Sequence, residues 1–207
     1  MTLSSPPSLT TARPEQVVLC APDGSFAGVA DKAGVHTTDT PLHLAFSCYV
    51  LDTAGRLLVT RRAAAKITWP GVRTNSCCGH PGPDEPIADA VLRRLSTELG
   101  LEVDRVDLLL PRFRYRSVMA DGTVENELCP VFRAVVPEGT PVRPDPAEVD
   151  ETWWQAWPEF VAAVELADDS LSPWGALQVD QLAALGPDPL SWPTADPADL
   201  PAAALRS

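Results

Sequence analysis

The sequence contains the stretch Asn75-Ser76-Cys77-Cys78-Gly79-His80-Pro81, and the helical pattern that follows it ends at Glu98-Leu99-Gly100. A thiol, an imidazole and a carboxylate therefore lie within one helix of each other along the chain. Cysteine, histidine and glutamate are side chains that often bind metals or carry protons in enzymes. This stretch predicts an active site, and the elements before and after it are expected to complete that site.

The helix after this stretch is predicted to begin near Asp84, a good N-cap residue, and to stop at Gly100. Ile87, Val91 and Leu95 recur every four residues, so one face of the helix is expected to be buried.

Strands are predicted on both sides of this helix. Residues 42–51 alternate, so that Leu44, Phe46 and Cys48 share one face and His43 and Ser47 share the other. Further strands are predicted at 17–21, 26–30, 56–62, 107–118, 123–136 and 148–157, with a hairpin turn at 120–122, and further helices at 158–167 and 173–185. This order predicts an α/β fold, a mixed sheet sandwiched by helices in a single domain.

Length, composition and charge limit the function. The chain has 207 residues, 45% of them apolar, which suits one domain with a substantial core. The net charge of −12 argues against a nucleic-acid partner, although a local basic cluster with a metal can still bind a small anion.

The five cysteines, two of them adjacent, suit a reduced, cytoplasmic protein better than a disulfide framework. No segment has the pattern of a signal peptide or a membrane span, and we expect a monomer.

The two ends of the chain differ in composition from its middle. Residues 1–15 are rich in Ser, Thr and Pro and are expected to be a disordered tail. Residues 16–186 are expected to form the domain, and residues 187–207, rich in Pro, Asp and Ala, a loose C-terminal tail.

A set of imidazoles and carboxylates suits a transition metal such as zinc or manganese. The chain has three histidines, His36, His43 and His80, and Glu125 and Glu127 lie two apart on a predicted strand, so both project from one face. No compact spacing links the five residues. The alternative interpretation is a solvated hairpin strand, with the histidines hydrogen-bonded elsewhere.

Cys78 lies beside Gly79 and His80, where nearby charge could make its thiol useful in proton transfer. A structural thiol is the alternative, and Cys77 has the same chemistry, so the residues alone do not choose between the two.

The helix has the spacing of a Nudix box, carried by Gly79, Glu85, Arg93, Glu98, Gly100 and Leu101. That box holds magnesium against a diphosphate with carboxylates on one helical face. Here Arg94 and Thr97 stand where the box has glutamates, so the carboxylate cluster that activates water for hydrolysis is incomplete. The interpretation is one magnesium ligand, Glu98, beside a phosphate clamp, Arg94; a plain surface ion pair is the alternative.

With these segments assembled, the chain resembles the type I isopentenyl-diphosphate isomerases, enzymes of the Nudix fold that interconvert isopentenyl and dimethylallyl diphosphate. The matching segments include His36-Thr-Thr-Asp-Thr-Pro-Leu-His43, Leu-Leu-Val-Thr-Arg61-Arg62, Trp69-Pro-Gly, Thr74-Asn-Ser-Cys-Cys78-Gly-His80-Pro, Phe113-Arg-Tyr115-Arg, Glu125-Asn-Glu127 and Ser172-Pro-Trp174. They run from about residue 17 to residue 185.

The resemblance implies a role for each of these residues. Cys78 would be the acid/base on one side of the substrate, and Glu127 with Tyr115 the pair on the other, acting through a tertiary carbocation. His36, His43, His80, Glu125 and Glu127 would bind manganese or zinc, and Glu98 with the Cys78 backbone carbonyl would hold Mg²⁺. Lys32, Arg62, Lys66 and Arg94 would bind the diphosphate, and Trp174, otherwise a core aromatic residue, would close over the apolar tail.

Two other functions fit part of the sequence. A Nudix hydrolase of another diphosphate would share the box, although its incomplete carboxylates count against this. A non-catalytic, metal-stabilised binding domain would share the histidines. In that case, changing Cys78 and Glu127 would leave any observed turnover intact.

Overall fold

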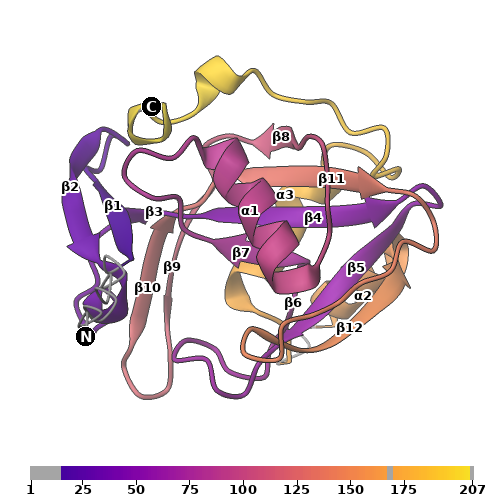
Figure 1. The fold of residues 1–207 in the computed structure, drawn as a ribbon, viewed down its shortest axis with the longest axis horizontal. Coiled ribbons are helices and arrows are strands. Elements are labelled where there is room, and N and C mark those ends of the chain that lie inside the picture. The colour runs from indigo at the N-terminus through magenta and orange to yellow at the C-terminus, as the bar shows by residue number, and fades with distance from the viewer. Residues whose placement is uncertain (1–14, 167–169, 206–207) are drawn as a thin grey trace, which may run out of the picture.

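The computed structural model describes residues 15–166 and 170–205 (Figure 1). The strands and α-helices within these residues are β1 (Gln16–Cys20), β2 (Phe26–Asp31), β3 (His43–Leu44), β4 (Phe46–Asp52), β5 (Arg56–Arg62), β6 (Arg73–Thr74), β7 (Cys77–Gly79), α1 (Ile87–Leu99), β8 (Asp107–Leu110), β9 (Arg114–Val118), β10 (Val124–Leu128), β11 (Val131–Val136), β12 (Val149–Ala156), α2 (Trp157–Glu165) and α3 (Pro173–Ala183). None of the described helices is long and apolar enough to cross a membrane.

The strands form two mixed sheets rather than one. The five-stranded sheet has the order β2-β1-β3-β10-β9, and the seven-stranded sheet has the order β12-β5-β4-β11-β8, with β6 paired to β5 and β7 paired to β4. The strand predicted at 42–51 is divided at Ala45 into β3 and β4, which belong to different sheets. The strand predicted at 123–136 is likewise divided into β10 and β11, at Cys129 and Pro130, because proline lacks the backbone N–H of a ladder residue.

Two parallel segments therefore pass from one sheet to the other, residues 43–52 and 124–136, which we call the crossing strands. β10 pairs parallel with β3, and β11 pairs parallel with β4. Between the two ladders the backbone N–H of Ala45 donates to Leu128 at 2.9 Å, and that of Ser47 donates to Pro130 at 3.1 Å. The hydrogen bonding thus continues through the junction of the two sheets.

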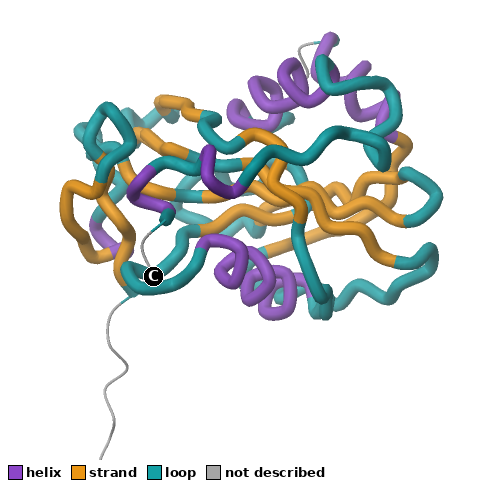
Figure 2. The backbone as a smooth tube through the Cα atoms, turned by 90° about the horizontal axis from the view of Figure 1, so that it is seen from above, coloured by secondary structure: helices purple, strands orange, loops and turns teal. Residues whose placement is uncertain are grey.

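Helices cover both faces of the seven-stranded sheet (Figure 2). One core packs α1 against the β4 face that carries Phe46 and Cys48, and the other packs α2 and α3 against the face that carries Tyr49. Every residue of β4 is buried. The alternation predicted for this strand, and a sandwich of sheet between helices, are confirmed.

The first helix begins later than predicted. α1 starts at Ile87, because Pro86 has an extended ψ of 133° and the Glu85 side chain is turned back to accept from the backbone N–H of Gly82. The helix ends as predicted at Gly100, whose φ of 62° lies in the left-handed region that glycine adopts most readily.

The expectation of a loose C-terminal tail is wrong for residues 187–205. Trp192 and Leu200 are buried, and the backbone N–H of Ala203 donates to Gly24 at 2.9 Å, beside the β1–β2 hairpin. Figure 1 shows this segment in yellow, running past β8 toward β1 and β2. The segment was missed because contacts with distant parts of the fold, rather than a helical or strand pattern of its own, hold it in place. The tail predicted at 1–15 lies outside the described residues, apart from Glu15.

Candidate functional site

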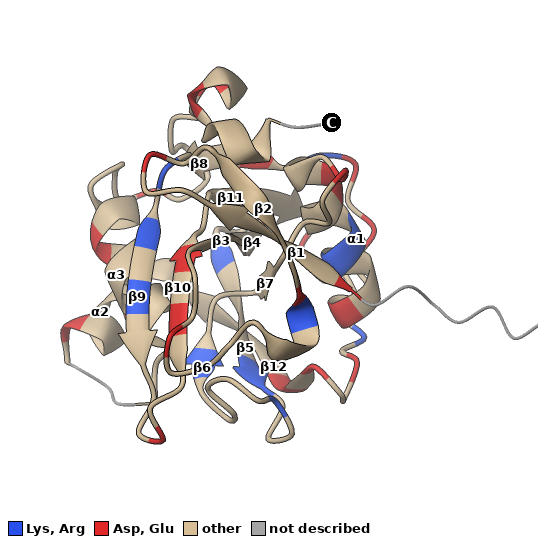
Figure 3. Cartoon of the chain, turned by 90° about the vertical axis from the view of Figure 1, so that its left-hand side faces the viewer, with Lys and Arg blue, Asp and Glu red and all other residues tan. Residues whose placement is uncertain are grey.

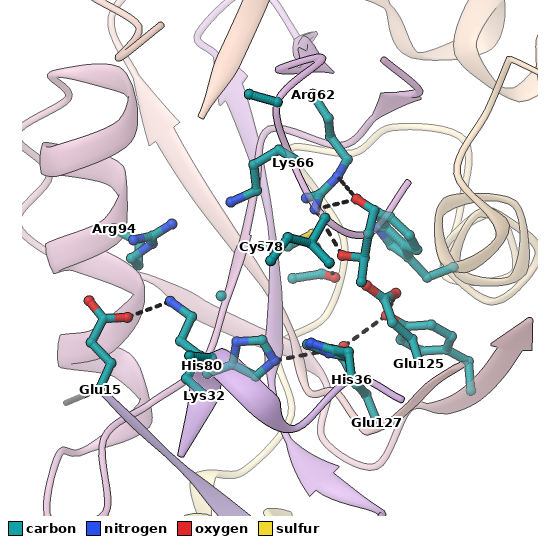
Figure 4. A pocket seen from close by; sticks show the side chains of 18 residues that line it. Glu15, Lys32, His36, Arg62, Lys66, Cys78, His80, Arg94, Glu125 and Glu127 are labelled. Atoms are coloured by element: carbon teal, nitrogen blue, oxygen red, sulfur yellow. Dashed lines mark hydrogen bonds and ion pairs between the residues drawn. The ribbon is translucent and has the colours of Figure 1, made fainter. Parts of the chain in front are cut away.

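A cavity of about 500 Å³ lies among elements of both sheets, α1 and α3 (Figure 4). Its lining includes most of the residues singled out from the sequence: Lys32, His36, Arg62, Lys66, Cys78, His80, Arg94, Tyr115, Glu125, Glu127 and Trp174. Two predicted residues, His43 and Glu98, are buried and do not line it. The fold thus gathers residues from distant segments of the chain around one space.

Three histidines converge on one carboxylate oxygen. Oε1 of Glu127 lies 3.2 Å from Nε2 of His80, 3.5 Å from Nε2 of His43 and 4.0 Å from Nε2 of His36. One ligand atom from each of these four residues lies within 4.8 Å of the other three. His36 comes from the loop after β2, His43 from β3, His80 from the end of β7 and Glu127 from β10, so only the folded chain assembles the group.

The chemistry of this group fits a metal ion. Nε2 of His36 and Nε2 of His43 are buried without a hydrogen-bond partner among the described residues, a costly state that a metal would relieve. Nδ1 of His43 lies 2.9 Å from the carbonyl of Pro41, and donation there leaves the Nε2 lone pair free to bind. Burial lowers the pKa of His36 to about 4, so its imidazole is in the neutral form that metals bind.

Glu125 and Glu127 both face inward from β10, so the alternative of a solvated hairpin face is wrong. Tyr115 on the neighbouring β9 donates to one or the other, with its hydroxyl 2.7 Å from Glu125 and 2.8 Å from Glu127. Figure 3 shows the acidic band of β10 beside the basic bands of β9, whose Arg114 and Arg116 are exposed. Glu125 lines the same cavity but lies outside the group of four.

The two carboxylates differ in pKa. Burial, and then the charge of Glu127, raise the pKa of Glu125 to about 7. Burial acts on Glu127 too, but the neighbouring imidazoles of His43 and His80, the second hydrogen-bonded to it at 3.2 Å, outweigh burial and hold the pKa of Glu127 well below the usual range. Glu127 is therefore the ionised partner that a cation would attract first.

The two adjacent cysteines face opposite sides of β7. Cys77 packs in the core beneath α1, with its Sγ 3.6 Å from Oε2 of Glu98. Cys78 lines the cavity, and burial raises the pKa of its thiol to about 11, so the group is a neutral proton donor near pH 7. Of the two thiols, strand geometry brings Cys78 and not Cys77 to the cavity, since neighbours on a strand point to opposite faces.

Four cationic side chains line the cavity, and three of them are paired with acids. Lys32 lies 2.6 Å from Glu15, Lys66 pairs with Glu148, and Arg94 lies 3.3 Å from Glu148. Figure 4 shows Lys32, Lys66 and Arg94 together on one side of the cavity. They form a basic cluster in a protein whose overall charge is negative.

Glu98 lies behind this cluster. It forms an ion pair with Arg94, four residues earlier on α1, and is buried rather than at the surface. Burial raises the pKa of Glu98, against the opposing charge of Arg94. The other glutamate of the box, Glu85, has a different partner: it accepts from Nε and Nη2 of Arg93, at 2.6 and 2.7 Å.

Trp174 forms an aromatic wall at the first turn of α3. Its ring centroid lies 5.9 Å from that of Tyr115, and the guanidinium carbon of Arg62 lies 5.6 Å from the ring. Arg62 also donates to the carbonyl of Thr68 at 3.0 Å. The indole N–H of Trp174 donates to Asn75 Oδ1 at 3.2 Å, which fixes the plane of the ring.

Sequence reasoning missed several polar residues around the cavity. Glu15 and Glu148 pair with its cations. Asn75 and Ser47 contact the Cys78 thiol, and Gln178 donates to Ser47. Ser47 shares the strand face of His43, and Gln178 follows Trp174 by one helical turn. These spacings were the available signals.

The chain was compared with known proteins. The NUDIX domain family matches residues 41–175. The chain is 54% identical to an isopentenyl-diphosphate Delta-isomerase of Saccharopolyspora erythraea over 92% of this chain and 97% of that protein. It is 56% identical to one from Clavibacter michiganensis subsp. michiganensis, over 81% and 86% of the two chains.

Solved structures share the fold at low sequence identity. The crystal structure of DR0079 from Deinococcus radiodurans superposes with a TM-score of 0.63 and 16% identity, covering 81% of this chain and 98% of that one. A MutT protein from Methanosarcina mazei Go1 superposes with a TM-score of 0.54 and 18% identity, covering 68% and 92%. These two likenesses support the fold alone.

Proposed function

Since this chain belongs to the type I isopentenyl-diphosphate Delta-isomerases of the Nudix family and interconverts isopentenyl and dimethylallyl diphosphate for isoprenoid biosynthesis, we propose a role for each residue of its cavity. The observation that carries the proposal is the position of two proton-carrying groups in one cavity. Cys78 reaches it from the seven-stranded sheet, and Glu127 reaches it from the five-stranded sheet.

The isomerisation adds a proton to the terminal alkene carbon and removes one from the carbon on the other side of the resulting tertiary cation. Two groups that reach one cavity from different sheets can do this without moving the substrate. Cys78 serves one wall as a neutral thiol that gives or regains its proton. Glu127 serves the other, with the Tyr115 hydroxyl hydrogen-bonded to it, so that charge on the carboxylate is compensated as a proton moves.

The basic cluster binds the diphosphate. Lys32, Arg62, Lys66 and Arg94 all line the cavity, and charge-assisted hydrogen bonds to phosphate oxygens are the interactions for which such side chains are suited. Glu98 and the Cys78 carbonyl would hold Mg²⁺, which would supply positive charge against the diphosphate. Support comes from Cys77 Sγ, which lies 3.6 Å from Glu98 Oε2 and 3.9 Å from the Cys78 carbonyl, so these two oxygens flank the same atom.

The histidine group would hold the second metal, manganese or zinc. His36, His43, His80 and Glu127 supply the ligand atoms, with Glu125 next to them on the same strand face. A bound ion would supply positive charge beside Glu127. The residues themselves keep this carboxylate ionised and oriented, since two of the imidazoles already lie within 3.5 Å of it.

Trp174 protects the cationic intermediate. An indole face stabilises a nearby cation by about 2 kcal/mol once water is removed. Exclusion of water matters equally, because water would trap a tertiary cation as an alcohol. The contacts of Trp174 with Tyr115 and Arg62 close this side of the cavity with a second aromatic ring and a guanidinium.

The direct test is proton NMR of the protein with isopentenyl diphosphate and magnesium in deuterated water, before and after chelation. We expect dimethylallyl diphosphate with deuterium incorporated, and loss of the reaction on chelation. An unchanged substrate signal from folded, metal-loaded protein would overturn the assignment. Release of phosphate or pyrophosphate from a panel of diphosphates would support a hydrolase instead.

A further inference from the structure

The thiol of Cys78 is held from behind by two fully buried polar side chains. Its Sγ lies 3.3 Å from Oδ1 of Asn75 and 3.4 Å from Oγ of Ser47. Both lie within the range of hydrogen bonds to sulfur. The orientation of the thiol therefore depends on which of these two partners accepts and which donates.

Asn75 can only accept from the thiol. Its Nδ2 donates to the carbonyls of Cys48 at 3.0 Å and Cys77 at 2.9 Å, so the amide cannot be flipped. Oδ1 accordingly faces the cavity side and also accepts from the indole N–H of Trp174. Because a carbonyl oxygen has no proton to give, the S–H of Cys78 is the donor in this bond.

Ser47 acts from the other side. Nε2 of Gln178 donates to Ser47 Oγ at 2.9 Å, while Oε1 of Gln178 accepts from the Tyr49 hydroxyl at 2.9 Å. Ser47 is thus already an acceptor, and its own proton remains for a sulfur. Two sulfurs compete for that proton at 3.4 Å, Cys78 and the buried Cys129.

We propose that Gln178 is a positioning residue of the isomerisation, which through Ser47 fixes the rotamer and proton direction of the Cys78 thiol. The inference rests on the proposed role of Cys78. Without Gln178, Ser47 would be free to accept from either thiol, and Cys78 could turn its proton away from Asn75. α3 would then contribute twice, with Trp174 as a cavity wall and Gln178 one turn later as the support for the thiol.

The test uses the full chain with Gln178→Met and Tyr49→Phe together, because removing both partners avoids leaving a buried hydroxyl unsatisfied. Ser47→Ala is an independent second variant. We expect kcat to fall about 10- to 100-fold in both, as for a misplaced reacting group. KM should stay within about twofold, because the cationic side chains that bind the diphosphate are unaltered.

Infrared spectroscopy gives a readout that does not depend on turnover. The S–H stretching band of Cys78 is isolated as the difference between the wild-type spectrum and that of Cys78→Ala. We expect this band to shift in Ser47→Ala and in the double variant. In Cys129→Ala, which removes only the competing sulfur, Ser47 still donates to Cys78, so kcat should stay within about twofold.

An unshifted band and an unchanged kcat in folded variants would overturn the inference. A fall in kcat and in melting temperature together with a rise in KM, while the band stays unshifted, would also overturn it. That result would mark Gln178 as structural only. Failure of the proposed role of Cys78 would look different, because Cys78→Ala itself would then keep its isomerisation activity.

Discussion

Replacement of Arg133 by methionine should release the C-terminal segment that was expected to be loose. Arg133 extends from β11 and is 7% exposed. Its Nη1 donates to the carbonyls of Pro189 at 2.9 Å and Leu190 at 3.0 Å, and its Nη2 donates to Asp107 at 2.8 Å. One guanidinium thus ties a sheet strand, an acid and the segment together.

The magnitude follows from these contacts. Methionine retains most of the apolar stem but leaves Asp107 and the two carbonyls without their donor. Breaking a buried, hydrogen-bonded ion pair in this way costs about 3–5 kcal/mol. Against a total stability of about 5–15 kcal/mol this is a large fraction. At about 2–4 °C per kcal/mol for a chain of this size, the melting temperature should fall by about 6–20 °C.

Urea and thermal unfolding followed by circular dichroism would measure the effect, with limited proteolysis to locate cleavage within 187–205. Arg105→Met is the matched control. Arg105 approaches the same Asp107, at 3.9 Å, but its side chain is 84% exposed, so its removal should cost less than about 1 kcal/mol. A loss below about 1 kcal/mol for Arg133→Met, or equal losses for the two variants, would refute the reasoning.

Three further outcomes are expected. Cys78→Ala should abolish isomerisation in the NMR assay with little change in folding, whereas Cys77→Ala should keep most activity; the reverse pattern would assign the chemistry to the other thiol. Adding manganese or zinc to chelated protein at about 100 times its Kd should raise stability by about 2.7 kcal/mol in calorimetry, and His43→Leu should remove that rise. An equal rise in both proteins would place the metal elsewhere. Glu98→Gln should increase the magnesium concentration needed for half-maximal turnover, and an unchanged magnesium dependence would contradict that assignment.

Much of the fold could be predicted because local signals and tertiary structure agree in it. Gly100 ends α1 where the apolar pattern stops, and Gly122 closes the predicted hairpin with a φ of 89°. The two faces of β4 enter two separate cores, as strict alternation requires. These features depend on residues close together in sequence.

The division into two sheets could not be predicted in the same way. Residues 42–51 alternate without interruption, and the break at Ala45 depends on pairing with a segment some eighty residues later. Arg133 gives a similar lesson, since nothing in its own strand indicates that its partners are carbonyls near the C-terminal end of the chain.

The candidate site shows the same limit. The residue types of His36, His43, His80 and Glu127 suggest a metal, but their convergence is set by long-range strand pairing. Gln178 offered only its helical spacing from Trp174, and buried glutamines on helices usually have no such role. The residue types at the site could be read from the sequence, but their convergence in space could not.

The crossing strands have a consequence for length variation among homologous chains. Side chains alternate along a strand, so one residue inserted at Ala45 would turn His43 and Ser47 to opposite faces of their sheets relative to each other. One residue inserted near Pro130 would shift the pairing of β10, which carries Glu127, by one residue relative to the pairing of β11. Insertions and deletions should therefore be excluded from both junctions, while the turn at 120–122, which is hydrogen-bonded within its own hairpin, can vary in length.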